Sequence, residues 1–302
     1  MATFNPDNVM MYESKEGEIP DKYNELILGD VMENSKVMQL GKYEEMNDKE
    51  NKFEYFAEGP GAYWVNEAEK IKTSKPKWLQ VTMVAKKLGV IIPVSNEYLN
   101  YKKANFFTEM QSKIAEAFYK KFDASVLLNK EGNPFPQSLE QIVQDSGKVI
   151  QGDLDYDNIL ELEDLLTEDD IEPNAFLSTR KNRSLLRGAG KLVGNTTEFL
   201  FDRANNTLDG LPVADLKALE KGELFTGDFN HMFYGIPNNI KYKISEDAQL
   251  STLENGDGTP VNLFEQDLVA LRATMDIAFM IVKDESFAKI EPSADEGGEE
   301  TP

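Results

Sequence analysis

The segment between residues 53 and 94 constrains the fold of this chain most, because it predicts two strands that cannot bury their own side chains. A short apolar run begins at Phe53, and a second begins at Trp78, where apolar and polar residues alternate. That period of two is typical of strands with one buried face. A polar stretch over residues 66–77 joins the runs, so we expect a long ribbon. Because an isolated ribbon is marginally stable in water, we expect a second copy of the chain to cover its aromatic side chains.

The side chains of this ribbon are the candidate contacts between subunits. Large aromatic residues are frequent hot spots where proteins meet, which favours a packing role over base stacking for the two tryptophans. The lysines of the polar stretch are available to pair with acidic groups of a neighbour. The candidate inter-subunit contact residues are Phe53, Tyr55, Tyr63, Trp64, Lys70, Lys72, Lys75, Lys77 and Trp78.

Charge is distributed unevenly along the chain. The net charge of −22 argues against sequence-independent binding of nucleic acid through a basic surface. Residues 60–121 nevertheless hold 11 lysines and 5 acids, whereas residues 151–302 carry a net charge of −18. Copies packed side by side would place basic regions against acidic ones, which steers and registers the partners.

Several kinds of reactive site are missing from the sequence. It has no cysteine, which excludes disulfides, thiolate metal sites and cysteine nucleophiles. It has one histidine, His231, which excludes zinc sites built from several histidines, and it has no Gly-x-Ser-x-Gly motif. We interpret His231 as a strand-end residue. We therefore expect no catalytic residue, no cofactor and no metal site.

Two further features bear on partners. The acidic turn over residues 168–172 offers oxygen ligands to a divalent cation, but its order differs from an EF-hand loop and a solvated turn is favoured. A metal-dependent hydrolase that uses this turn is kept as one alternative. The start of the chain lacks the pattern of a signal peptide. The best apolar stretch, residues 268–282, is short and interrupted by Arg272 and Asp276, so no membrane partner is expected.

The remaining patterns predict an α+β protein. One short helix is expected over residues 24–38 of a polar N-terminal arm. Ser95 or Asn96 is expected to cap a short helical turn, and Asn105 is expected to cap the longest helix, which ends before Gly132. Asp155 or Asp157 is expected to cap another helix. The cleanest pattern is the alternation over residues 269–281, which predicts a long strand with one buried face.

This order of elements, with a series of short sequence blocks, resembles the major capsid proteins of tailed bacteriophages, which have the Hong Kong 97 fold. The similarity is greatest to siphophages of Gram-positive bacteria. One block is Gly61-Ala-Tyr-Trp-Val-Asn-Glu67 in the ribbon. The others follow in order at residues 87–95, 133–135, 174–178, 182–187, 208–213, 227–229, 262–273 and 286–288.

The resemblance implies a division of the chain into the parts of that fold. Residues 1–42 would form an N-terminal arm and residues 43–90 an extended loop. Residues 91–149 and 261–291 would form a peripheral domain, with a spine helix over residues 105–128. Residues 150–260 would form an axial domain, and the acidic tail over residues 292–302 would be disordered.

The resemblance also implies a structural protein that assembles with itself. Hexamers and pentamers would close into an icosahedral shell around double-stranded DNA, bound without sequence specificity, in the cytoplasm of a bacterial host. About 50 residues precede the loop, so we expect a separate scaffolding protein, and a portal protein is the other expected partner. Lys70, Lys72, Lys75 and Lys77 are candidates for a covalent cross-link, although no partner asparagine is identified. The alternative with the same fold is an encapsulin-type compartment that encloses a cargo enzyme.

Overall fold

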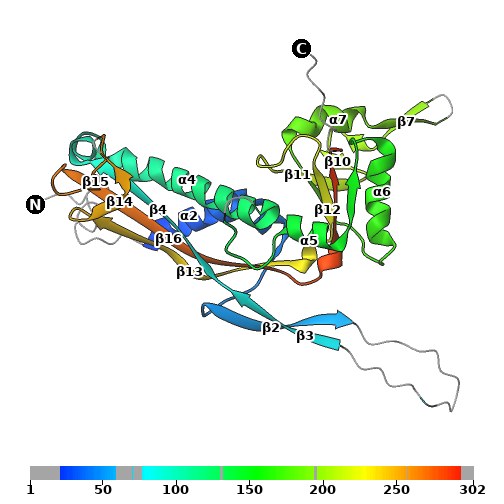
Figure 1. The fold of residues 1–302 in the computed structure, drawn as a ribbon, viewed down its shortest axis with the longest axis horizontal. Helices are drawn as coiled ribbons and strands as arrows, with labels where there is room; N and C mark the ends of the chain where they lie inside the picture. The colour runs from blue at the N-terminus through cyan, green and yellow to red at the C-terminus, as the bar shows by residue number, and fades with distance from the viewer. Residues whose placement is uncertain are drawn as a thin grey trace, which may run out of the picture.

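The computed structural model describes residues 21–58, 70, 77–129, 132–193, 196–256 and 258–293. Figure 1 shows an elongated molecule with a body at each end and a two-stranded ribbon that projects away from both. None of the described helices is long and apolar enough to cross a membrane. These helices are α2 (Asp21–Asn34), α3 (Lys36–Leu40), α4 (Asn96–Leu128), α5 (Leu139–Ser146), α6 (Tyr156–Thr167) and α7 (Arg183–Gly188), with 3-10 turns at Arg180–Asn182, Phe229–His231 and Asp284–Ser286.

The body that contains α4 is built on a four-stranded sheet. Its strands lie in the order β1 (Lys42–Tyr43), β13 (Met232–Ser245), β16 (Leu268–Ile281) and β4 (Lys86–Ser95). Strand β16 pairs antiparallel with both β13 and β4, and α4 packs against one face of the sheet. The predicted strand with a buried face is confirmed, because these residues of β16 are buried: Val269, Leu271, Ala273, Met275, Ile277, Phe279 and Ile281.

Helix α4 begins nine residues before the start that the sequence predicted. The side chain of Ser95 accepts a hydrogen bond from the backbone N–H of Glu97 and caps the helix. The expected short turn and the expected helix from Asn105 are therefore one continuous helix, and the cap at Asn105 was wrong. No glycine or proline separates the two stretches, so nothing interrupts the helical backbone. Asn129 ends the helix in the left-handed conformation, with φ of 52°.

Residues 21–40 form two helices where the sequence predicted one short helix in an extended arm. Ser35 separates α2 from α3 and caps α3 through its side chain. Asp123 of α4 holds this junction: it accepts from the Ser35 hydroxyl at 2.6 Å and from the backbone N–H of Lys36 at 2.8 Å. Burial raises the pKa of Asp123 to about 6, although these hydrogen bonds act in the opposite direction. A buried carboxyl group thus ties the segment to α4.

The second body contains a seven-stranded sheet covered by α6. Asp209 and Gly210 join two of its strands with positive φ angles of 44° and 81°, as a tight hairpin turn requires. The side chain of Asp155 caps α6 by accepting from the backbone N–H of Asn158 at 2.8 Å. The strand order is β5 (Val149–Gln151), β17 (Phe287–Glu291), β12 (Leu224–Gly227), β6 (Ala175–Ser178), β11 (Leu211–Asp215), β10 (Thr207–Leu208) and β9 (Phe201–Asp202).

Three two-stranded sheets complete the described fold. They are the hairpin of β7 (Gly190–Val193) with β8 (Thr196–Phe199), the pair β14 (Gln249–Glu254) with β15 (Pro260–Asn262), and the ribbon of β2 (Glu50–Glu58) with β3 (Lys77–Val84). All three pair antiparallel.

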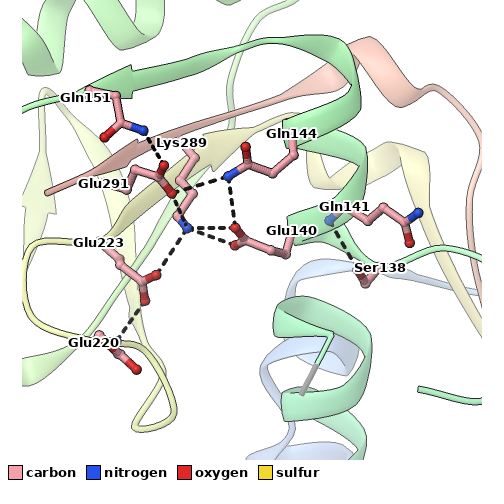
Figure 2. A network of polar contacts seen from close by, with 9 residues as sticks. All are labelled: Ser138, Glu140, Gln141, Gln144, Gln151, Glu220, Glu223, Lys289 and Glu291. Atoms are coloured by element: carbon pink, nitrogen blue, oxygen red, sulfur yellow. Dashed lines mark hydrogen bonds and ion pairs between the residues drawn. The ribbon is translucent and has the colours of Figure 1, made fainter. Parts of the chain in front are cut away.

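Lys289 of β17 is buried where α5 meets the seven-stranded sheet, with a side chain that is 3% exposed. Figure 2 shows its amino group among three carboxylates, at 2.8 Å from Glu140 Oε1, 2.9 Å from Glu291 Oε2 and 3.1 Å from Glu223 Oε1. Burial acts to lower the pKa of Lys289, but the hydrogen bonds to Glu140 and Glu291, and then the charges of Glu140 and Glu223, outweigh it. The pKa is therefore held above its ordinary value. The protonated lysine joins α5, β17 and the start of β12.

We predict that the junction at Asp123 makes stability depend on pH. The folded chain keeps the proton of Asp123 up to about pH 6, whereas an unfolded chain releases it near pH 4. The folded state therefore binds more protons in this window, so its stability falls as the pH rises through it, by up to about 3 kcal/mol. Asp123→Asn removes this titration. Urea unfolding at pH 4.5, 5.5 and 7 should show wild type losing stability relative to the variant, and a constant difference would contradict the prediction.

We predict that Lys289→Met destabilises the chain by roughly 3–5 kcal/mol at neutral pH, because it leaves three carboxylates together without their cation. The penalty should shrink as the pH is lowered towards 4, where carboxylates take up protons. Urea unfolding of both chains would measure it. Lys217→Met, at an exposed lysine, is the control and should have little effect. Equal stability of wild type and Lys289→Met would contradict the assignment.

Candidate functional site

The candidate site is the ribbon of β2 and β3 (Figure 1). Its register pairs Phe53 with Val81 and Tyr55 with Leu79, which puts these four apolar side chains on one face. The backbone N–H of Ala85 donates to the carbonyl of Lys49 at 2.8 Å and closes the base. Strand β4 begins at the next residue, so the ribbon is joined to the four-stranded sheet by a single residue.

The base of the ribbon packs on the body of its own chain. The ring of Phe53 lies 5.3 Å from the ring of Phe233 on β13, and the ring of Tyr55 lies edge-on to His231 at 6.0 Å. Met83 of β3 is 1% exposed and joins the same apolar cluster. The expectation that only a second copy would cover the aromatic side chains is therefore corrected for Phe53 and Tyr55.

Gly235 of β13 makes this packing fit. A Cβ atom at this position would lie 2.6 Å from the sulfur of Met46 and 2.8 Å from the methyl carbon of Met83. The absence of a side chain therefore lets two methionines lie directly against the strand. The packing of Met46, Phe233 and Gly235 was not predicted from the sequence. A glycine within a strand pattern is the signal from which a close approach at this place could have been predicted.

The apolar face of the ribbon loses its cover further out. Val81 is 6% exposed, whereas Leu79, two residues along the same face of β3, is 43% exposed. The body of the chain therefore covers the face as far as Val81 and leaves Leu79 in solvent. An exposed apolar side chain that continues a buried face is typical of a contact with another molecule.

The other predicted contact residues are placed only in part. Lys70 is exposed. The backbone of Lys77 and Trp78 lies in β3. The side chains of Lys77 and Trp78, and the whole of Tyr63, Trp64, Lys72 and Lys75, lie outside the described residues.

His231 ends the 3-10 turn that immediately precedes β13, close to the strand end where it was expected, and its contacts do not form a proton relay. Its Nδ1 atom is 2.9 Å from the hydroxyl of Ser286 and 3.4 Å from a carboxylate oxygen of Asp228. A catalytic triad needs its acid and its nucleophile on different ring nitrogens, whereas both groups here approach the same one. Burial lowers the pKa of His231, although the charge of Asp228 acts to raise it.

Burial and neighbouring groups explain the shifted pKa values of two other carboxyl groups, those of Glu163 and Asp169. Burial raises the pKa of Glu163 to about 7, and the nearby carboxylate of Asp209 adds to the rise. Asp169 of the acidic turn binds the amino group of Lys148 at 2.6 Å, which lowers its pKa. Among the described residues, no group of three or more histidine or acidic side chains is arranged to hold a metal ion.

Comparisons with known proteins give a consistent result. The model of a family described as the phage capsid family matches residues 18–291. The major capsid protein of Staphylococcus phage 80alpha is 56% identical over 293 residues, which cover 96% of this chain and 90% of that protein. Two solved structures, each 22% identical, share the fold. One, from Microbacterium phage Oxtober96, has a TM-score of 0.66 and covers 86% of this chain and 91% of its own. The other, from Mycobacterium phage Adephagia, has a TM-score of 0.67 and covers 87% and 91%.

We predict that Phe53→Ala loosens the base of the ribbon. The change removes the ring that packs on Phe233, and for a half-buried aromatic side chain this should cost about 1–3 kcal/mol. Hydrogen exchange of the backbone amides of β2 and β3 should accelerate, while exchange in the seven-stranded sheet stays as it was. Lys52→Ala, at an exposed neighbour on the opposite face, is the matched control. Unchanged exchange in β2 and β3 would contradict the packing described.

Proposed function

From the premise that this chain belongs to the phage capsid family and has the Hong Kong 97 fold, we propose how it builds the phage head. It is a major capsid protein of a tailed phage, a structural protein that associates with itself. The encapsulin alternative is not favoured, because the relatives are phage capsid proteins. We propose below which surface joins the copies and what the shell encloses.

The outer part of the ribbon contacts a neighbouring copy. The observation that carries this proposal is the change from buried Val81 to exposed Leu79 along one apolar face. Within the described residues, no apolar surface of the chain covers Leu79. A second copy supplies that surface, and closed symmetry repeats the contact throughout a shell. The predicted contact residues of the ribbon other than Phe53 and Tyr55, including the lysines at 70, 72, 75 and 77, belong to this interface.

The shell is icosahedral, is built from hexamers and pentamers, and encloses double-stranded DNA held without sequence specificity. The strongly acidic character of the chain supports this, because a surface that does not displace counterions lets packaged DNA move. A separate scaffolding protein directs assembly, a portal protein occupies one vertex, and assembly takes place in the cytoplasm of the bacterial host. The chain has no enzymatic role, which the arrangement around His231 supports.

The parts of the fold are assigned as follows. Residues 1–42 are the N-terminal arm and residues 43–90 the extended loop. Residues 91–149 and 261–291 are the peripheral domain, and residues 150–260 are the axial domain. Helix α4 is the spine helix, with its start moved to Asn96. The change of architecture between the two bodies supports this division.

Leu79→Asp tests the proposed contact. We expect a chain that folds with nearly wild-type stability, because Leu79 is largely exposed in the single copy. Co-expressed with the neighbouring scaffold gene, it should yield few closed shells by negative-stain electron microscopy. Gln80→Asp is the matched control, since it adds the same charge on the exposed opposite face of the ribbon.

We expect the Gln80→Asp control to form shells in normal number. Normal shells from Leu79→Asp would contradict the proposed role of this face. If the wild-type chain forms no shells with its scaffold, the result would contradict the proposed mode of assembly as a whole.

A further inference from the structure

The four-stranded sheet has a second face, on the side opposite α4. Residues that stand directly opposite each other in an antiparallel pair share one face of a sheet. Lys243 of β13 stands opposite Arg272 of β16, and Lys241 stands opposite Thr274. On the other side of β16, Arg272 stands opposite Ile91 of β4. These residues therefore lie together, and the side chains that alternate with them along the strands pack towards α4.

This second face is basic and uncovered by the described part of the chain. Lys87, Lys241, Lys243 and Arg272 are all exposed, and Ile91 among them is 50% exposed. Within the described ranges, no ion pair forms at any of the four cations. We call these five residues the basic face. It is unusual in a chain with a net charge of −22.

The arrangement of the basic face is unfavourable in a single copy. Neighbouring strands are about 5 Å apart, so Lys243 and Arg272 hold like charges on adjacent backbones. Like charges directly opposite each other destabilise a sheet. The register also places Asp276 on this face, opposite Lys87, and Asp276 is only partly exposed. The face therefore keeps a surplus of positive charge that a partner with negative charge would relieve.

A cavity of about 220 Å³ extends the basic face to the base of the ribbon. It opens where the pairing of β13 with β16 shifts register between Gly235 and Asn238. Lys49, Lys86 and Lys87 line it together with Asn238 and Asp276. Ammonium and amide groups around a small hollow suit a carboxylate, because each donates hydrogen bonds to oxygen.

We propose that the basic face and this cavity are a docking surface for a carboxylate-rich surface of a second copy of the chain. Residues 151–231, which form most of the seven-stranded body, hold 17 acids and 8 lysines or arginines, a net charge of −9, so a neighbouring copy offers the complementary charge. The seven-stranded body lies at the other end of the elongated molecule (Figure 1), so its acids cannot neutralise the face within one copy. The contact is then head-to-tail, the type that generates rings and shells.

The chemistry of the face favours protein over a nucleic-acid polyanion. Exposed Ile91 lies on the edge strand β4, opposite Arg272, and exposed Gly89 lies two residues along the same strand, opposite Thr274. An exposed apolar side chain beside a cation matches a protein surface that combines apolar and acidic groups. A phosphate backbone offers no partner to Ile91. The proposal rests on the proposed function in that it requires shells, and it adds a second contact surface distinct from the ribbon.

Zero-length cross-linking tests the proposal on wild-type shells. Shells are assembled with the scaffold from equal parts of ¹⁴N- and ¹⁵N-labelled chain and treated with a carbodiimide, which joins lysine amines to carboxylates in direct contact. Mass spectrometry should find Lys87, Lys241 or Lys243 joined to acids of residues 151–231 in mixed-label peptides. Links that carry one label only, or no links at these lysines, would overturn the proposal.

Charge reversal gives an independent test. Lys241→Glu with Lys243→Glu should reduce the yield of closed shells about tenfold or more, because the loss is repeated at every copy. Lys181→Glu with Lys217→Glu changes two exposed lysines elsewhere by the same charge and should leave the yield near wild type. Urea unfolding of each variant separates a loss of assembly from a loss of folding.

The other outcomes decide between alternatives. Normal shells from Lys241→Glu with Lys243→Glu would overturn the docking surface while leaving the proposed function intact. Normal shells that retain less DNA than wild type would overturn it in favour of a polyanion on this face. Absence of shells from the wild-type chain with its scaffold would remove the proposed mode of assembly, and the inference with it.

Discussion

The pairing of β16 with strands on both of its sides creates a sheet with two faces to cover, and helices α2, α3 and α4 cover only one of them. Helix α4 buries the face that carries Ala273 and Met275. On the opposite face, Ala278 lies beneath the base of the ribbon. Further along that face, Lys243 and Arg272 remain in solvent. The described part of the chain leaves this stretch of the sheet uncovered, and the proposed docking of a second copy would cover it.

Buried charged groups join the elements that the apolar core alone would leave free to shift. Asp123 fixes the start of α3 against α4, and Lys289 fixes α5 against β17. Leucine in either position would fill space but would satisfy no backbone or carboxylate group. Burying such groups costs desolvation free energy. Their hydrogen bonds and ion pairs offset this cost only when every partner is in place. They therefore specify one arrangement of the elements, which a subunit needs if it is to meet identical neighbours in the same way.

The ribbon shows which features could be predicted from the sequence and which could not. The alternation along residues 78–85 predicted a strand with one apolar face, and β3 has that face. The pattern also indicated that the face needs a cover from outside the ribbon. Whether that cover belongs to the same chain was open, because Phe53 and Phe233 are 180 residues apart in sequence and no local pattern connects them. The error at the start of α4 has a different cause. Asn105 is a good capping residue, but a cap acts only where the helix in fact begins.

The sequence by itself determined the local elements, because the period of apolar residues, the caps at Ser95 and Asp155 and the turn at Asp209-Gly210 act between near neighbours. It also determined the unequal distribution of charge. Only the tertiary structure decided which residues share a face. Cross-strand register places Lys243 opposite Arg272, and a glycine at 235 brings two methionines against β13. These are contacts between distant segments, and their positions depend on the packing of the whole sheet.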